Sequence, residues 1–217
     1  MNNMEQARFN MVEQQIRPWD VLNSEVLDLL KKLKREQFVP SEQRALAFMD
    51  VDIPLGYDAY MWQPKLEARA LQALSLTGNE SVLEIGTGSG YLTALLSNLA
   101  ERVTSVEIVK ELSEFASRNL ASHHVSNVEL HIGDAANGWG DGLYDAIVLT
   151  ASVPMQPTEL LVNLKVGGRL FAVIGDAPAM EACLITRISA EEISSVTLFE
   201  TSVAALLNVQ QPQRFVF

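Results

Sequence analysis

Residues 82 to 90 read Val-Leu-Glu-Ile-Gly-Thr-Gly-Ser-Gly, a short apolar run that leads into a glycine-rich turn. A helix-like stretch follows the turn, and a second apolar run over residues 103–106 ends at Glu107. A strand, a glycine turn and a helix, followed by a strand with an acid at its end, are typical of a cofactor site at the carboxyl edge of a parallel sheet. The stretch therefore predicts an α/β fold with a ligand site at this edge.

The spacing of the glycines favours one class of cofactor over another. They are Gly86, Gly88 and Gly90, whereas a dinucleotide-binding turn would place its last glycine at position 91, which is a tyrosine. Glu84 precedes the first glycine, and a pyrophosphate group would gain nothing from a carboxylate there. An acid followed by Gly-x-Gly-x-Gly is the pattern of methyltransferases that use S-adenosylmethionine (SAM).

The chemistry of SAM agrees with the composition of the loop. SAM has no phosphate, and the loop contains no lysine. The three glycines would let the backbone approach the ligand at positive φ, and N–H groups at the start of the next helix would face the SAM carboxylate. Thr87, between the first two glycines, is a further candidate cofactor-binding residue. Glu84 would balance the SAM ammonium group, directly or through water. Glu107 would accept both ribose hydroxyls; the alternative is a solvated acid at a strand end.

A third strand-like run ends at Gly133 and Asp134. An acid in this position could accept a hydrogen bond from the adenine amino group, or it could be a turn or helix-capping residue. Asp145 begins a later strand at the opposite edge of the sheet, so we expect it to be structural. The pair His123-His124 has no neighbouring cysteine or carboxylate cluster, and no metal site is expected.

The composition describes a folded protein of one domain, or of one domain with a small appendage. The chain has 217 residues, of which 48% are apolar, and a net charge of −11. It has no basic stripe that would favour nucleic acid and no apolar run near the roughly 20 residues of a membrane helix. The N-terminus lacks a secretory signal, and Cys183 is the only cysteine. We therefore expect a cytoplasmic protein with no nucleic-acid or membrane partner.

Strand-like and helix-like segments alternate from residue 81, which predicts a doubly wound, mainly parallel Rossmann-like sheet. The expected strands lie near residues 81–85, 102–106, 127–132, 144–149 and 168–174, and the expected helices near 90–99, 109–121 and 156–164. Two further runs, 181–188 and 195–205, would add an antiparallel member. Upstream, helices are expected near 4–16, 24–35, 41–48 and 64–74, with an irregular stretch at 49–64. The chain thus divides into an N-terminal helical cap, 1–76, and a SAM-binding core, 77–217, within one continuous domain.

Motifs over nearly the whole length resemble those of the protein-L-isoaspartate (D-aspartate) O-methyltransferase family. The matching segments are residues 11–17, 21–40, 47–50, 53–56, Gln63-Pro64 and 84–91, followed in family order by Gly133-Asp134, Gly138-Trp139, Tyr144-Asp145, Thr150-Ala151 and Gly167-Gly168. The resemblance implies a SAM-dependent methyltransferase that methylates the α-carboxylate of isoaspartyl residues in damaged proteins and so begins their repair. The acceptor would be an isoaspartyl-containing protein or peptide. A carboxylate is already ionised at neutral pH, so the reaction needs no strong base.

One segment departs from the family pattern. The family's Gly-Gln-Thr-Ile-Ser, which precedes Gln-Pro, corresponds here to Asp58-Ala59-Tyr60-Met61-Trp62. The resemblance places Trp62 at the position of the family's active-site serine and Tyr60 at that of its threonine, so these two are the candidate catalytic positions. Either the pocket serves a different, unidentified methyl acceptor, or the chain binds SAM as a non-catalytic interaction protein, or these residues only pack against the helical cap.

Overall fold

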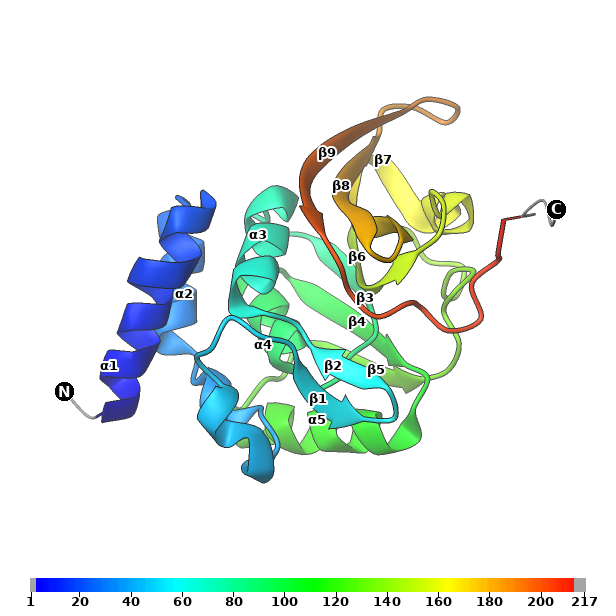
Figure 1. Ribbon diagram of the computed structural model, residues 1–217. Coiled ribbons are helices and arrows are strands. Elements are labelled where there is room, and N and C mark those ends of the chain that lie inside the picture. Colours follow the sequence, from blue (N-terminus) through cyan, green and yellow to red (C-terminus); the bar gives the residue numbers. More distant parts are fainter. Residues whose placement is uncertain (1–2, 213–217) are drawn as a thin grey trace, which may run out of the picture.

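The computed structural model describes residues 3–212 and is built around one seven-stranded sheet (Figure 1). The strand order is β5-β4-β3-β6-β7-β8-β9, and the first five strands in this order are parallel. The strands are β3 (Ser81–Ile85), β4 (Arg102–Glu107), β5 (Val128–Ile132), β6 (Tyr144–Val153), β7 (Leu164–Asp176), β8 (Ala179–Arg187) and β9 (Ile193–Thr201). β8 runs antiparallel to both of its neighbours. The predicted Rossmann-like architecture is confirmed.

The two faces of the sheet carry separate hydrophobic clusters because side chains alternate along each strand. Val82 packs in a cluster with residues of α3 (Pro64–Leu74) and α4 (Tyr91–Leu99), including Leu71 and Leu95. Its neighbour Leu83 packs in the second cluster, which includes Leu160. The predicted strand at 81–85 matches β3, all five of whose residues are buried. α5 (Lys110–Ser122) follows β4 as expected.

One predicted helix has a different form. Residues 156–164 hold a short 3₁₀ helix, η5 (Thr158–Asn163), in place of an α-helix. Pro157 precedes it and Leu164, where β7 begins, is already extended. Only six residues remain between these limits, and an α-helix so short is unstable because nucleation is costly.

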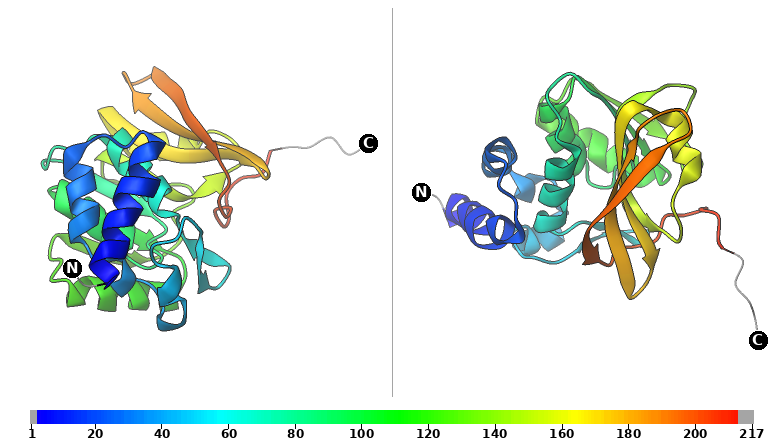
Figure 2. Two further views of the ribbon diagram at one scale, coloured as in Figure 1. Left: turned by 60° about the vertical axis from the view of Figure 1, so that its left-hand side comes forward. Right: turned by 90° about the horizontal axis from the view of Figure 1, so that it is seen from above.

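The N-terminal region is helical, as predicted, and α3 has the predicted bounds. The helix expected at 4–16 changes from α-helix to π-helix after Asn10, and those expected at 24–35 and 41–48 end earlier. Its elements are α1 (Asn3–Asn10), the π-helix η1 (Met11–Ile16), and the 3₁₀ helices η2 (Arg17–Trp19), η3 (Arg35–Gln37) and η4 (Ser41–Leu46), with α2 (Ser24–Lys32) between η2 and η3. The side chain of Asn23 caps α2 by accepting from the N–H groups of Glu25 and Val26. α3 lies between these helices and the sheet (Figure 2).

The stretch 49–64, which was expected to be irregular, contains a hairpin. β1 (Ile53–Gly56) pairs with β2 (Ala59–Met61), and the two form a sheet of their own. Tyr57 and Asp58 join them with φ of 55° and 56°, the combination that a type I′ hairpin turn requires. The prediction was wrong because Pro54 and Gly56 resemble loop residues when they are considered alone.

One hydrophobic cluster contains residues from both sides of the expected boundary at residue 76, including Ile16, Leu30 and Leu95. We therefore propose that the N-terminal cap and the core fold as one unit. Among residues 3–212, no helix combines the length and apolar character needed to span a bilayer.

Candidate active site

A cavity of about 580 Å³ lies at the carboxyl ends of β3, β4, β5 and β6, where ligands bind in parallel α/β sheets. The hairpin β1–β2 and residues 202–207 also line it. Its lining includes six carboxyl groups, those of Asp52, Asp58, Glu67, Glu84, Glu107 and Asp134, but no lysine, arginine or histidine from the described part of the chain. The cavity therefore suits a ligand with positive charge.

The glycine loop 86–90 forms one wall of this cavity, and its conformation explains its sequence. Gly86, Gly88 and Gly90 have φ of +94°, +53° and +81°, a region that glycine adopts at little cost. A Cβ on Gly86 would lie 2.1 Å from Oγ1 of Thr150. That hydroxyl donates to the carbonyls of Ile85 and Gly86, at 2.9 and 2.7 Å, and holds the turn against β6.

Glu84 is fully buried in β3 and lines the cavity. Its Oε2 atom accepts hydrogen bonds from the hydroxyls of Thr93 and Ser105, the second at 2.6 Å. Its Oε1 atom has no hydrogen-bond partner among residues 3–212. Burial raises the pKa of Glu84 to about 8, against the opposing hydrogen bonds. A buried oxygen without a partner, next to a cavity, suits the ammonium group of a ligand.

Glu107, at the end of β4, is held by two backbone N–H groups. Oε2 accepts from Gly88 at 2.9 Å, and Oε1 accepts from Val109 at 3.0 Å. Each carboxylate oxygen has a second lone pair, so both oxygens can still accept from a diol. The backbone contacts fix the orientation of the carboxylate before any ligand binds.

Asp134 lies at the end of β5, but the structure gives its carboxyl two contacts within the protein. Oδ1 accepts from the N–H of Ala136 at 3.0 Å, and Oδ2 accepts from Nδ2 of Asn208 at 2.8 Å. Asp134 therefore has the turn role that was one of its two expected roles. At Gly133 an added Cβ would lie 2.6 Å from the ring of Trp139, so this glycine permits close packing beneath the cavity wall.

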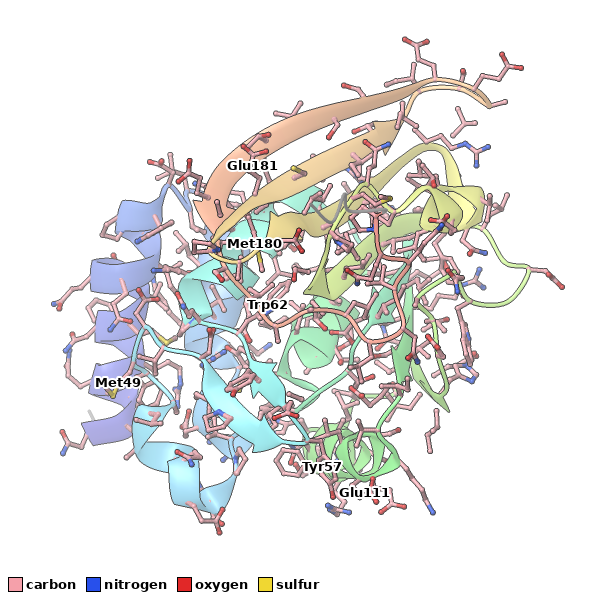
Figure 3. The ribbon with its side chains drawn as sticks, turned by 45° about the vertical axis from the view of Figure 1, so that its right-hand side comes forward. Met49, Tyr57, Trp62, Glu111, Met180 and Glu181 are labelled. Carbon is pink, nitrogen blue, oxygen red and sulfur yellow. The ribbon has the colours of Figure 1, made fainter. Side chains whose placement is uncertain are left out.

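The hairpin residues Tyr60, Met61 and Trp62 line the opposite wall. Tyr60 is 49% exposed, whereas Trp62 is 5% exposed and packs edge-on against Phe171 at a centroid distance of 6.1 Å. Figure 3 shows Trp62 between the hairpin and the start of β8, near Met180. Its carbonyl accepts from Arg35 at 2.5 Å, and its Nε1 atom has no hydrogen-bond partner in the described part of the chain. Trp62 thus packs in the core and also lines the cavity.

Several functional features were missed by sequence reasoning. We define residues 202–208 as the C-terminal segment, which follows β9 (red in Figure 1). Its residues 202–207 line the cavity, and it pairs with Ser152, whose N–H donates to Ala204 and whose carbonyl accepts from Leu206, both at 2.8 Å. Residues 202–205 were predicted to belong to the last strand, but that strand ends at Thr201. Asp52 and Glu67 were also missed, because no local pattern shows that they meet the cavity.

Residues expected to have no role in the site lie outside it. Asp145 accepts from the N–H of Ser81 and from Lys165, at 2.9 and 2.8 Å, at the opposite edge of the sheet, as expected. Cys183 is buried in β8. In residues 3–212, no group of three or more histidine, cysteine or carboxylate side chains could hold a metal ion.

Comparison with known proteins relates this geometry to a family. The family model of protein-L-isoaspartate(D-aspartate) O-methyltransferase (PCMT) matches residues 6–207. The chain belongs to this family. It is therefore a SAM-dependent methyltransferase, and SAM is its cofactor. A protein-L-isoaspartate O-methyltransferase of Rhodopseudomonas palustris (strain ATCC BAA-98 / CGA009) is 38% identical over 208 residues, which cover 94% of this chain and 95% of that protein.

Other proteins named as members of this family also match the chain over most of their length. The relative from Syntrophus aciditrophicus is 39% identical over 197 residues, 90% of each chain. A Plasmodium falciparum structure, named as a protein-L-isoaspartate O-methyltransferase in complex with S-adenosyl-L-homocysteine, superposes with a TM-score of 0.76 at 20% identity over 95% of this chain and 99% of that one. At such low identity the superposition shows the fold alone.

The residues around the cavity fit SAM by two observations. The unpaired Oε1 of Glu84 can accept from the ammonium group. The oxygens of Glu107 can accept from the ribose hydroxyls. These two contacts would fix the amino-acid and ribose parts of SAM.

Proposed function

We propose that this PCMT-family protein transfers the methyl group of SAM to the α-carboxylate of an isoaspartyl residue in a protein or peptide. The observation that carries the proposal is the continuity of the cavity, which is lined at once by the cofactor residues Glu84 and Glu107 and by the hairpin residues Tyr60 and Trp62. Donor and acceptor can therefore share one cavity. Relatives named as protein-L-isoaspartate O-methyltransferases match the chain over almost its whole length.

The proposed reaction is a direct displacement. SAM supplies an electrophilic methyl group on its sulfonium. A carboxylate oxygen forms a bond to that carbon as the carbon–sulfur bond breaks, which gives a methyl ester and S-adenosylhomocysteine (SAH). The carboxylate is ionised at neutral pH, so the protein needs to supply orientation and exclusion of water. We assign orientation of the donor to Glu84 and Glu107, and enclosure of the acceptor to the hairpin and the C-terminal segment.

The proposed cofactor residues are those expected from the sequence: Glu84, Gly86, Thr87, Gly88, Gly90, Glu107, Gly133 and Asp134. Asp134 would accept from adenine through a lone pair that Asn208 and Ala136 leave free. We also propose a reducing compartment, the cytoplasm, in keeping with a single cysteine.

A second candidate function keeps the cofactor and changes the acceptor. Trp62 stands where the family resemblance places a serine hydroxyl, and an indole donates but cannot accept. An acceptor carboxylate would enter a cavity lined by six carboxyl groups and by no cation of residues 3–212. These two observations favour slow transfer to isoaspartyl residues, or a neutral or cationic acceptor.

Ligand binding and methyl transfer together test the proposed function. SAM or SAH at a hundredfold excess over Kd should stabilise the native state by about 2.7 kcal/mol, which raises Tm by a few degrees for a chain of this size. Radiolabel from SAM should enter an isoaspartyl peptide but not the same peptide with normal aspartate. Absence of a Tm shift at millimolar SAM would contradict cofactor binding, and equal labelling of both peptides would contradict the acceptor.

The ribose assignment is tested at Glu107. Glu107→Ala removes charge-assisted hydrogen bonds worth about 1.5–3 kcal/mol, so SAH should bind at least about tenfold more weakly. Calorimetric titration with SAH measures the loss. The alanine variant also frees the N–H groups of Gly88 and Val109, and Glu107→Gln, which retains one acceptor oxygen, is the matched control with an intermediate loss. Unchanged affinity in Glu107→Ala would exclude the end of β4 as the ribose site.

A further inference from the structure

A second hollow, of about 260 Å³, lies between the start of α3 and the end of β9 (Figure 1). Ser202 is exposed and lines both this hollow and the cavity. The two spaces also adjoin along the chain, because Gln63 of the hollow directly follows Trp62 of the cavity wall. We call the hollow the side groove and define it by six of its lining residues: Trp19, Lys65, Arg69, Phe199, Glu200 and Ser202.

The side groove differs from the cavity in its charge. Two cations, Lys65 and Arg69, line it together with one acid, Glu200. The cavity is lined by six carboxyl groups and by no cation of residues 3–212. Lys65 and Arg69 are four positions apart in α3, so they lie on the same face of that helix. On a chain with a net charge of −11, the side groove is therefore a local positive region beside an acidic cavity.

Arg69 is fixed in orientation but only loosely paired with an acid. Its Nη1 atom donates to the carbonyl oxygen of Trp19 at 2.9 Å, and its guanidinium group lies over the ring of Phe199, 4.7 Å from the centroid. Its ion pair with Asp20 spans 3.8 Å, and the Asp20 side chain is 90% exposed. Because such an exposed pair contributes little, a carboxylate that meets the guanidinium group with better geometry can replace Asp20.

Lys65 and the two aromatic rings form the rest of the groove that a ligand would meet. Nζ of Lys65 binds Asp50 at 2.6 Å and lies 4.1 Å from the centroid of the Trp19 ring. Trp19, which is 38% exposed, meets Phe199 edge to face at 6.3 Å. Exposed aromatic surface beside a cation suits a ligand with methylene groups and a charged end. The side groove thus fits a short aliphatic stem that ends in a carboxylate, as a glutamate side chain does.

A polypeptide acceptor would gain from such an attachment. Its isoaspartyl carboxylate meets like charge in the cavity, which weakens binding, and a contact of opposite charge outside the cavity offsets that loss. Because Ser202 borders both spaces, an extended chain, which advances about 3.3 Å per residue, can cross from one to the other within a few residues. We propose that the side groove is an acceptor subsite, in which Arg69 binds the carboxylate of a glutamate close in sequence to the isoaspartyl residue. This subsite presupposes the proposed polypeptide acceptor and adds a preference for acidic flanking sequence.

The test is a positional scan of peptide binding to the SAH-loaded protein by calorimetry, which requires no turnover. Each probe is an eleven-residue peptide, uncharged except for a central isoaspartyl residue and one glutamate, which occupies one of four positions on either side. The matched peptide has glutamine in place of the glutamate. At one or two of these positions, glutamate should bind wild type about fivefold more tightly than glutamine. Because the contact is partly exposed, 0.5 M salt should reduce this preference.

Variants of Arg69 show whether the preference comes from the side groove. Arg69→Gln keeps part of the stem and removes the charge, so glutamate and glutamine peptides should bind it within about twofold of each other. Arg69→Lys should keep part of the preference, and Arg69→Glu should instead favour a peptide with lysine at that position. Arg118→Gln is the matched control, since Arg118 is an exposed arginine on α5 outside both hollows, and its preference should equal that of wild type.

The pattern of losses distinguishes recognition from structural damage. A structural role for Arg69 predicts that Arg69→Gln weakens both peptides alike, whereas recognition predicts a loss for the glutamate peptide alone. The proposal is overturned by that equal loss, by a preference that survives in Arg69→Gln, by the absence of any position that prefers glutamate, or by wild type that binds none of the peptides at 1 mM, roughly the weakest Kd of interest. Failure of the proposed function differs: the glutamate preference persists, but peptides with normal aspartate bind equally well and no methyl group is transferred.

Discussion

Glu84→Gln is expected to weaken SAM binding by one to two orders of magnitude while the protein remains folded. The substitution keeps the side-chain volume and an acceptor for Thr93 and Ser105. It removes a carboxyl group that the ammonium group of SAM would hold ionised, although burial raises its pKa to about 8 in the free protein. A hydrogen bond to a charged group is worth about 1.5–3 kcal/mol, which corresponds to about ten- to a hundredfold in affinity. Calorimetric titration of both proteins with SAM measures the difference, and equal affinities would remove Glu84 from the cofactor site.

The same substitution should change how stability depends on pH. The folded-state pKa of Glu84 is raised to about 8 from an ordinary value of 4.5. Below pH 4.5 the carboxyl group is protonated in both states and has no effect. Between these values the unfolded state loses the proton first, so this group lowers the free energy of unfolding as pH rises, until the loss levels off above about 8. In denaturant titrations at pH 5, 6, 7 and 8, the free energy of unfolding should therefore fall less with pH in Glu84→Gln than in wild type.

A block replacement of residues 58–62 by Gly-Gln-Thr-Ile-Ser should raise kcat for isoaspartyl peptides at least about tenfold above wild type. The family resemblance places a small hydroxyl where the indole of Trp62 fills space beside the acceptor. Glycine also suits position 58, where Asp58 has φ of 56°. SAM affinity should stay close to wild type, since the glycine loop and Glu107 are untouched.

The single change Trp62→Ser is the control for this block. It should restore little activity, because Ala59 and Tyr60 would still shape the hairpin wall. Initial rates at saturating SAM and peptide compare the three proteins. A wild-type kcat of about 1 s⁻¹ or more, an ordinary enzyme rate, would show that Trp62 is no obstacle to transfer.

Local sequence patterns were sufficient to predict the central strands of the fold. β3 was predicted with its exact bounds, 81–85, because a buried central strand is a short apolar run that ends at a glycine turn. The glycines of that turn, and Glu84 and Glu107 beside it, lie close in sequence to the strands that position them. Their spacing therefore contains the information about the cofactor end of the cavity.

The acceptor end depends on contacts that are distant in sequence. Asp52 and Trp62 reach the cavity through the hairpin, and the hairpin turn uses Tyr57 and Asp58, which carry no glycine signal at those positions. Ser152 meets the C-terminal segment some fifty positions further along the chain. Residue type and periodicity do not report such pairings, so neither the hairpin nor this wall of the cavity was predicted.

The C-terminal segment makes methyl transfer in the cavity depend on an uncut chain. It completes the cavity through main-chain bonds to Ser152 and through the contact between Asn208 and Asp134, yet most of the hydrophobic core lies upstream of it. A proteolytic cut after Thr201 would therefore leave the sheet assembled but remove one wall of the cavity. The truncated protein would stay folded, but water would reach the bound SAM and its methyl group would not be transferred.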